Sequence, residues 1–595
     1  MSDQKNLIIA VALSIAVIMG FQFFYEMPRM EAEQARQLAL EEAQAQDGPI
    51  DAQTPQVSSV DGSSAAVPVP GGASVGSVPG EVPAPAPTNG GINGAIVAAA
   101  PRVPVNSDRL RGSISLRGGR IDDLALVNYH ETIDPTSPEI VLLAPTGTEH
   151  PYHAEFGWAP APGANPKLPK RDTKWRTNDS QLSPGSPVTL RWDNGEGLLF
   201  ERTYTLDDNF MITVRQQVTN QTGGTVTLYP YGLISRTGTP EVSGFIILHE
   251  GALGVFDGEL VEEDYEDIQE AGSQKFTSTG GWLGVTDKYW LTALIPDQGQ
   301  KFTGTINHSL SGNSDRYQVD YLLDGQQIPT GGSVTTLNRL FAGAKEADLL
   351  ETYNDTFQIN SFNLAIDWGY LRFLTQPLFH VLKWLYALVG NFGVAILLLT
   401  VAIKMVFFPL ANKSYKSMSM MRKLQPEIVK MRERFSDDKA RLQQEMMALY
   451  KKEKVNPMAG CLPIVVQIPV FFALYKVLFV TIEMRHAPFF GWIKDLSAPD
   501  PLTFITLFGV FPWDAPQMLA IGIWPLLMGA SMFLQQKLNP QPADPMQAKI
   551  FLFMPIMFTF LLGSFPAGLV IYWTWNNVLS ITQQWVIMRR MGVKI

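Results

Sequence analysis

The hydrophobic pattern divides the chain into long apolar runs and one region of short alternating runs. Six apolar runs approach the length that a helix needs to cross a hydrocarbon core of about 30 Å. These predicted spans are residues 7–24, 392–410, 464–482, 518–534, 550–562 and 569–586. Between the first two spans, residues 106–347 alternate Val-, Ile-, Thr- and Tyr-rich runs with Gly, Asp and Asn turns. The pattern predicts six transmembrane helices and a separate β domain.

The alternating region, residues 106–350, predicts a large antiparallel sandwich. In one predicted strand Ile212, Val214 and Val218 share a face. The acidic run Asp257–Glu270 is interpreted as a solvated loop or face. The histidines of this region have no spacing typical of a metal site, and we expect neither a metal nor a catalytic site there. These histidines are His130, His150, His153, His249 and His308.

The segments before the sandwich have a different composition. Residues 1–28 are interpreted as an uncleaved anchor, because Ala10-Val11-Ala12 lies inside the apolar run and Phe23, Phe24 and Tyr25 close it. In residues 29–105, the part from about 47 to 104 is dominated by Pro, Gly, Ala, Ser and Val. Such a composition cannot bury enough apolar surface to fold. We therefore predict a disordered periplasmic linker.

Residues 357–390 are aromatic and amphipathic, and aromatic rings concentrate at the membrane–water boundary. We expect part of this stretch to lie on the membrane surface as an interfacial helix. The core follows at residues 391–590 and contains a basic, helical stretch that is interrupted at Phe435–Asp438, where Ser436 can cap a second helix. A cytoplasmic helical hairpin over residues 411–457 results.

The hairpin is rich in methionine, and flexible thioethers suit varied apolar partners. Filling the hairpin's own seam is the alternative use for most of these side chains. The methionines considered for substrate capture are Met418, Met421, Met431, Met446 and Met447.

Charge sets the expected orientation. Residues 412–456 carry twelve Lys or Arg against six Asp or Glu, and Arg589, Arg590 and Lys594 end the chain, whereas residues 484–517 carry little basic charge. Because basic loops face the cytoplasm, we expect both termini there and the sandwich in the periplasm. The net charge of −10 argues against general binding to nucleic acid, and the single Cys461 excludes an intramolecular disulfide.

Lys404 is the only charged residue within residues 392–410. A charge in a span is costly and usually faces a wet or protein-lined cavity, although a lysine that snorkels to the inner interface is the alternative. Thr400 lies one turn earlier, Gln467 adds an amide to the third span, and none of the predicted spans contains an acidic residue. We therefore favour a hydrophilic groove that opens to the cytosol.

The last span carries a polar stripe. At 100° per residue its members lie within about 60° of one line. They are Trp573, Asn576, Asn577, Ser580 and Gln584. Such stripes also join helices to one another, and this alternative stays open.

The carboxyl-terminal third of the chain resembles the YidC membrane protein insertases with a large periplasmic domain. The matching strings include QPLFHVLKWLYALVGNFG, MRKLQPEIVKMRERFSDDKARLQQEMMALYKKEKVNPMAGCLPIVVQIPVFFALYKVL, DPMQAKIFLFMPIMF and FPAGLVIYW. The resemblance implies an α-helical polytopic membrane protein with a five-helix insertase core around a groove, plus an all-β periplasmic supersandwich. The hairpin is expected to help capture a nascent transmembrane segment.

By position, the resemblance assigns Lys404 to the groove cation, which many members supply as arginine. Thr400 and Gln467 match groove-lining positions, and Ile468 and Pro469 match the sliding face of the third span. Trp573 replaces a tyrosine of some relatives. Loop 502–516 looks longer than in close relatives and has no assigned role.

The resemblance implies an insertase and chaperone of the inner membrane that is not an enzyme and needs no nucleotide, cofactor or metal. Its implied partners are nascent inner-membrane proteins, the Sec translocon, the lipid bilayer and, weakly through its basic tail and hairpin, the ribosome, with no DNA. A secondary transporter is one alternative, although no acidic relay or repeat of the spans is visible. A membrane-tethered periplasmic ligand-binding protein is another, since such sandwiches resemble those of sugar mutarotases.

Overall fold

A computed structural model describes residues 100–242, 248–312, 314–435, 438–453, 455, 462–505, 521–539 and 545–592. The predicted anchor, nearly all of the predicted linker and most of loop 502–516 lie outside these residues. The chain divides into two compact units. We call them the helical unit, whose described residues lie in His380–Leu474 and Pro488–Ile595, and the sandwich unit, whose described residues lie in Thr54–Phe379 and Tyr475–Ala487.

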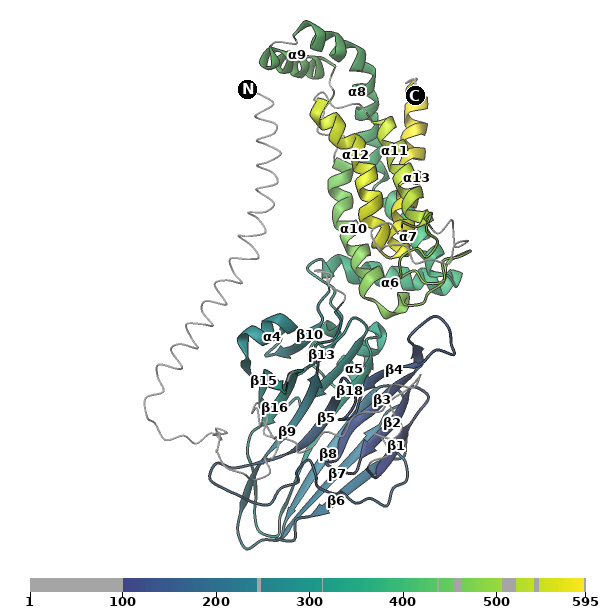
Figure 1. Cartoon of the computed structure of the whole chain (residues 1–595). Helices are drawn as coiled ribbons and strands as arrows, with labels where there is room; N and C mark the ends of the chain where they lie inside the picture. Colours follow the sequence, from purple (N-terminus) through teal and green to yellow (C-terminus); the bar gives the residue numbers. More distant parts are fainter. Residues whose placement is uncertain are drawn as a thin grey trace. The chain divides into compact units, whose positions relative to one another are not determined.

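The sandwich unit contains two antiparallel sheets (Figure 1). The ten-stranded sheet has the order β1 (Arg102–Asn106), β2 (Leu110–Ser115), β3 (Arg120–His130), β5 (Tyr152–Pro160), β9 (Val226–Thr237), β16 (Ser314–Leu323), β15 (Lys301–Ser311) and β12 (Ser273–Thr279), with β4 (Glu139–Leu143) beside β3 and β17 (Gln326–Ile328) beside β9. The eight-stranded sheet has the order β11 (Glu259–Asp264), β10 (Gly251–Phe256), β13 (Gly281–Thr286), β14 (Trp290–Ile295), β18 (Ser333–Ala344), β8 (Met211–Asn220), β7 (Leu198–Leu206) and β6 (Val188–Asp193).

Alternating side chains build the core between the sheets, as the sequence predicted. Ile212, Val214 and Val218 of β8 are completely buried. Phe256 of β10 packs against Phe302 of β15, with ring centroids 6.2 Å apart, so rings from both sheets meet. Period-two burial of this kind fixes which face of each strand turns inward.

The acidic run Asp257–Glu270 forms a strand and a helix rather than a loop. Residues of β11 are followed by α4 (Tyr265–Ala271), and the Asp264 carboxylate caps this helix by accepting from the backbone N–H groups of Glu266 and Asp267. Tyr265 and Ile268 are buried, which leaves the acidic side chains on the outer face of the helix. Their solvated position agrees with the sequence interpretation, whereas the backbone is regular because capping satisfies its first N–H groups.

The remaining helices are α5 (Ala347–Thr356), α6 (Arg372–Val389), α7 (Phe392–Val406), α8 (Phe408–Arg434), α9 (Lys439–Lys452), α10 (Leu462–Val480), α11 (Ile523–Leu538), α12 (Pro545–Leu561) and α13 (Ala567–Arg590). Short 3₁₀ turns cover Phe362–Ala365, Ile482–Met484 and Leu562–Ser564. Helices α10 to α13 overlap the last four predicted spans. By length and hydropathy, no single described helix passes as a membrane span, but α7 and α8 pass jointly as a pair bent by 70°.

The predicted interfacial segment contains α6, whose two faces differ. Phe379 and Leu382 are buried, whereas Phe373, Trp384 and Leu388 expose 77%, 61% and 63% of their surface. A helix with large apolar side chains on its exposed face is typical of one that lies at a membrane surface.

The bend after α7 corrects the prediction of one continuous span to Leu410. Helix α7 ends at Val406, and the Phe407 N–H donates to the Ile403 carbonyl at 3.1 Å before α8 begins. Pro409 lies at the start of α8. Because proline has no N–H and its ring clashes with the carbonyl four residues earlier, the helix cannot continue straight. An apolar run alone did not reveal this break.

Helices α8 and α9 cover most of residues 411–457, for which the sequence predicts a helical hairpin. Helix α8 ends at Arg434, and the Asp438 carboxylate accepts from the Arg441 N–H at 2.9 Å to cap α9. Asp438 therefore caps the second helix. The predicted cap, Ser436, lies outside the described residues. An aspartate caps a helix as well as a serine does and adds a favourable charge at the amino terminus.

Asp500 caps α11 from a distant loop. Its carboxylate is 4% exposed and accepts from the Trp524 N–H at 2.8 Å, the Trp492 Nε1–H at 3.0 Å and the Leu502 N–H at 3.1 Å. Gly522 precedes the helix and has no side chain that could cap it. Asp500 thus supplies the missing cap and holds its own loop against α11.

The first prediction concerns the buried ammonium of Lys345. Lys345 is 3% exposed, and its ammonium donates to the Thr286 hydroxyl at 2.8 Å. Burial lowers the pKa of Lys345 from 10.5 to about 8, opposed by Asp287 and more distant carboxylates. Since the folded pKa is the lower one, the unfolded chain binds more protons between pH 8 and 10.5, and stability rises with pH across this window.

We expect Lys345→Met to stabilise the sandwich unit at pH 7, by on the order of 3 kcal/mol, and this gain to vanish towards pH 10.5. Unfolding midpoints of the full chain at pH 7, 9 and 10.5 measure the effect. Lys275→Met, at an exposed lysine of β12, is the matched control and should show no such trend. A gain that is equal at all three pH values would show that burial of the charge is not its cause.

Candidate functional site

Lys404 lies in the last turn of α7 and reaches α13. Its ammonium donates to the Ser580 hydroxyl at 2.7 Å, and that hydroxyl donates to the Asn576 carbonyl at 2.8 Å. Ser580 is 2% exposed and Lys404 is half-buried. A serine hydroxyl can accept one hydrogen bond while it donates another, so both of its polar functions are used.

A second pair joins α10 to the same face of α13. The Gln467 side-chain amide donates to the Asn576 side-chain oxygen. Two tyrosines that the sequence analysis did not select complete the cluster, since Tyr415 interacts with Ser580 and Tyr572 with Gln467. Polar side chains from α7, α8, α10 and α13 therefore converge on one point.

A small hollow adjoins this cluster. It has a volume of about 30 Å³. Its lining combines the polar groups of Lys404, Tyr415 and Gln467 with apolar side chains of α7, α8 and α10. Since one water needs roughly 10–15 Å³ of such volume and at least two polar partners, the hollow has room for about two waters.

The charge of Lys404 has no acidic neighbour within the described part of the chain. No carboxylate there forms an ion pair with its ammonium. The Ser580 hydroxyl accepts from it instead, and the Gln467 amide lines the same hollow. Such neighbours solvate a cation without neutralising it.

The other predicted groove residues take several positions. The Thr400 hydroxyl donates to the Ile396 carbonyl of its own helix at 2.7 Å and is buried. Ile468 exposes 47% of its surface, and Pro469 is half-buried. Trp573 packs edge-on against Phe471 of α10, with centroids 4.5 Å apart. Thr400 is therefore satisfied locally and does not contact Lys404 through its hydroxyl.

The polar stripe of α13 divides between two neighbours. Asn576 and Ser580 face the Lys404 cluster, whereas the Asn577 amide donates to the Ser531 hydroxyl of α11 at 2.9 Å. The Gln584 amide donates to the Leu538 carbonyl at 3.1 Å, also at α11. The second pair joins helices, which is the alternative that the sequence left open.

The hairpin methionines differ in exposure. Met418 and Met421 are buried in a cluster with Tyr415 and with Ile587 of α13, so these two fill a seam. Met431 and Met446 are half-buried, and Met447 exposes 39% of its surface. Only part of the predicted methionine set is therefore accessible to a partner.

A second hollow and the absence of a metal-binding group among the described residues complete the description of the helical unit and the rest of the chain. A larger hollow of about 480 Å³ lies between α11 and α12 and is lined almost entirely by apolar side chains, among them Phe533 and Phe553. It does not include Lys404. Among the described residues, no group of three His, Cys, Asp or Glu is placed to hold a metal ion.

Comparison with known proteins gives consistent matches over both units. A family model described as the YidC periplasmic domain matches residues 102–381, and one described as the 60Kd inner membrane protein matches residues 384–594. The membrane protein insertase YidC of Bradyrhizobium diazoefficiens is 51% identical over 100% of this chain and 97% of its own.

The insertase YidC of Methylobacterium radiotolerans is 49% identical over 100% of this chain and 96% of its own. A solved structure of an active YidC insertase with its first transmembrane domain resolved covers 82% of this chain and 95% of its own, with 17% identity and a TM-score of 0.35. The full-length identity to curated relatives confirms the resemblance found in the sequence. The chain belongs to the YidC family of membrane protein insertases, which are not enzymes.

Proposed function

We propose that this protein inserts inner-membrane proteins and helps them fold, through a hydrophilic groove that opens to the cytosol. It acts alone or together with the Sec translocon. Within this proposal the chain has six spans, both termini are cytoplasmic, and the sandwich is periplasmic. The 97% coverage of an insertase relative supports the assignment.

One observation carries the proposal. The ammonium of Lys404 lies among helices that match predicted spans, beside a hollow with room for water, and it donates to a hydroxyl rather than to a carboxylate. Its charge therefore stays available to a visiting acidic group. A lysine that merely snorkelled to the interface would have no need of Ser580, Gln467 and Tyr415 around it.

The energetics explain why no nucleotide is required. Burial of a substrate helix of about 20 apolar residues is favourable, at roughly 0.3–0.6 kcal/mol for each central Leu, Ile, Phe or Val. The barrier is kinetic, because a polar segment that crosses the bilayer must lose its hydration. A groove that holds water to mid-membrane shortens the dry distance, and Lys404 attracts acidic residues near the substrate's amino terminus.

The remaining residues take supporting roles in the proposal. Gln467, Asn576 and Ser580 keep the groove polar, and Trp573, with Ile468 and Pro469, offers an apolar path along which the substrate helix leaves for the lipid. Asn577 joins α13 to α11 through Ser531, whereas Thr400 is bonded within its own helix. The exposed hairpin methionine Met447, with half-buried Met431 and Met446, is the surface that first captures the nascent segment.

Two further partners belong to the same proposal. The hairpin and the tail carry clustered basic residues, which suit a weak contact with ribosomal RNA. The exposed aromatic face of α6 suits the outer surface of the bilayer.

Site-specific crosslinking tests the groove. With a photoreactive amino acid at position 573, we expect crosslinks to a stalled, single-span nascent chain, because this position lies beside the proposed exit path. Val578 on the same helix is the matched control, since it lies about 140° away. Val578 is 38% exposed, and Trp573 is less exposed because it is half-buried. Exposure alone would therefore favour crosslinking from the control position.

Several-fold stronger crosslinking from position 573 than from position 578 supports the groove. Equal crosslinking from both positions would mean that the nascent chain meets α13 from the lipid side, and the groove would then have to be abandoned.

A further inference from the structure

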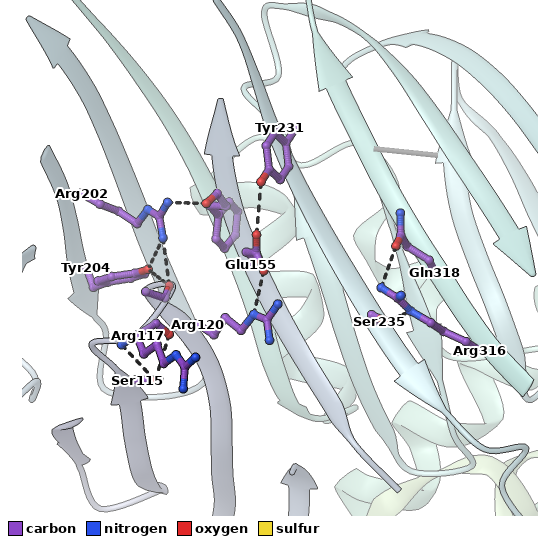
Figure 2. A network of polar contacts seen from close by, with 12 residues as sticks. Ser115, Arg117, Arg120, Glu155, Arg202, Tyr204, Tyr231, Ser235, Arg316 and Gln318 are labelled. Atoms are coloured by element: carbon purple, nitrogen blue, oxygen red, sulfur yellow. Dashed lines mark hydrogen bonds and ion pairs between the residues drawn. The ribbon is translucent and has the colours of Figure 1, made fainter. Parts of the chain in front are cut away.

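The outer face of the ten-stranded sheet is polar although much of it is buried. The register places Ala154 beside Ile121 and Ile234, and these apolar residues turn into the core. The intervening positions therefore share the opposite face of β3, β5, β9 and β16. They include His153, which is paired with Ser235, and the residues Arg120, Glu155, Ser235 and Arg316 that Figure 2 shows. Of these, Glu155, Ser235 and His153 are 4%, 1% and 8% exposed.

Three guanidinium groups gather here around one carboxylate. Arg120 donates to one oxygen of Glu155 at 2.8 Å, and Tyr231 donates to the other at 3.2 Å (Figure 2). Arg316 donates to the neutral Ser235 hydroxyl at 2.9 Å and to Gln318 at 3.3 Å. Arg171, from the loop that follows β5, lies close enough to interact with Arg120, Glu155 and Arg316. Each oxygen of Glu155 thus accepts one hydrogen bond.

Two further carboxylates lie near this cluster, and Asp122 interacts with Arg120. Asp320 is further along β16 and accepts from the Gln318 amide at 2.8 Å, and Asp122 on β3 is bonded to Arg102. Arg202 approaches from β7 of the other sheet, where it donates to the Gly119 and Phe156 carbonyls (Figure 2). Arg202 therefore adds to the positive potential around Glu155.

Several polar atoms of the cluster are buried without a partner among the described residues. They are Arg120 Nη2, Arg171 Nε and His153 Nε2. Buried polar groups are nearly always hydrogen-bonded, and a charged donor that is buried without an acceptor is especially unfavourable. Two of these atoms belong to guanidinium groups, which can only donate, and this indicates that an acceptor is missing.

The pKa values of Arg316, Arg171 and His153 agree with a missing acceptor. Burial, together with Arg171 and Arg120, lowers the pKa of Arg316 to about 10, although Glu155 opposes the shift. The pKa of Arg171 is lowered by burial and by Arg120. The pKa of His153 is lowered well below its usual range by burial and then by the arginines, so the ring is neutral. Each guanidinium group therefore disfavours the charged form of its neighbours.

We propose that Arg120, Arg171 and Arg316 bind a small divalent oxyanion, such as a phosphate group, on the outer face of the sandwich. Planar guanidinium groups match the oxygens of phosphate in pairs, and two positive charges remain after Glu155 is counted. Arg171 and Arg316 are half-buried, which gives a small ligand access from the surface. This site is independent of the Lys404 cluster.

Titration calorimetry on the full chain in detergent tests the site. Inorganic phosphate and glycerol phosphate are titrated separately at constant ionic strength, with acetate as a monovalent comparison. We expect saturable binding of phosphate and a rise in the unfolding midpoint. Binding of glycerol phosphate as well would identify the phosphate group itself as the ligand feature, and binding of inorganic phosphate alone would identify the free ion. An equal response to acetate would overturn the proposal.

The variants Arg171→Gln and Arg316→Gln should each weaken phosphate binding by about tenfold. Without phosphate, Arg171→Gln should not lower the unfolding midpoint, because it relieves repulsion between cations. Arg215→Gln, at an exposed arginine of β8, is the matched control and should bind as the unaltered chain does. Absence of heat beyond the chloride blank would refute the site, as would an affinity that both cluster variants leave unchanged.

Discussion

Lys404→Glu is expected to reduce the insertion of a substrate with a short polar tail by at least about tenfold. Two unit charges 4 Å apart interact by about 4 kcal/mol at an effective dielectric constant of 20, so reversing one sign changes attraction into comparable repulsion. The carboxylate would also repel acidic residues of the substrate tail. Protease protection of the tail in reconstituted vesicles measures the effect.

Two further replacements at the same position separate charge from shape. Lys404→Arg should retain most activity, because the charge remains and the hydroxyl of Ser580 can accept from a guanidinium as well. Lys404→Ala should fall between arginine and glutamate. Lys413→Glu, at an exposed lysine of α8, applies the same charge change outside the cluster and should have a much smaller effect. Full activity of Lys404→Glu would remove the electrostatic part of the proposed function.

Asp500→Ala is expected to destabilise the helical unit by on the order of 3 kcal/mol. The change removes three hydrogen bonds to a buried carboxylate and leaves the first turn of α11 without its cap. The midpoint of thermal unfolding of the detergent-solubilised protein, followed by tryptophan fluorescence, reports the loss, since Trp492 and Trp524 both contact Asp500.

Asp500→Asn keeps one acceptor oxygen and should lose less stability than alanine. Asp495→Ala in the same loop is the control, because the Asp495 carboxylate accepts from the nearby Ser497 through local bonds. If Asp500→Ala and Asp495→Ala had the same unfolding midpoint, the Asp500 carboxylate would not be what stabilises α11.

Local patterns predicted the class of each unit well. Alternation along β8 identified its buried face, and the interrupted helical pattern after residue 411 predicted two helices, which are α8 and α9. These features depend on neighbours along the chain. The long matching strings then identified the family, which the full-length relatives confirm.

The sequence analysis missed or left open the features that depend on contacts between different helices or strands. Asn576 and Asn577 are adjacent in sequence, but about 100° separates them on a helix, and this is enough to send their amides to different neighbours. Tyr415 of α8 interacts with Ser580 of α13, which is far away in the sequence. Arg120, Arg171 and Arg316 come from distant parts of the sequence, and the order of β3, β5, β9 and β16 brings two of them onto one sheet face.

The broken helix at Phe407 also supplies Lys404 with a counter-charge made of backbone. The carbonyl end of a helix carries about half a negative elementary charge, and Lys404 lies in the final turn of α7. This partial charge is fixed and delocalised, so it offsets the ammonium without occupying the place of a carboxylate. An acidic residue of an arriving chain therefore has no resident acid to displace.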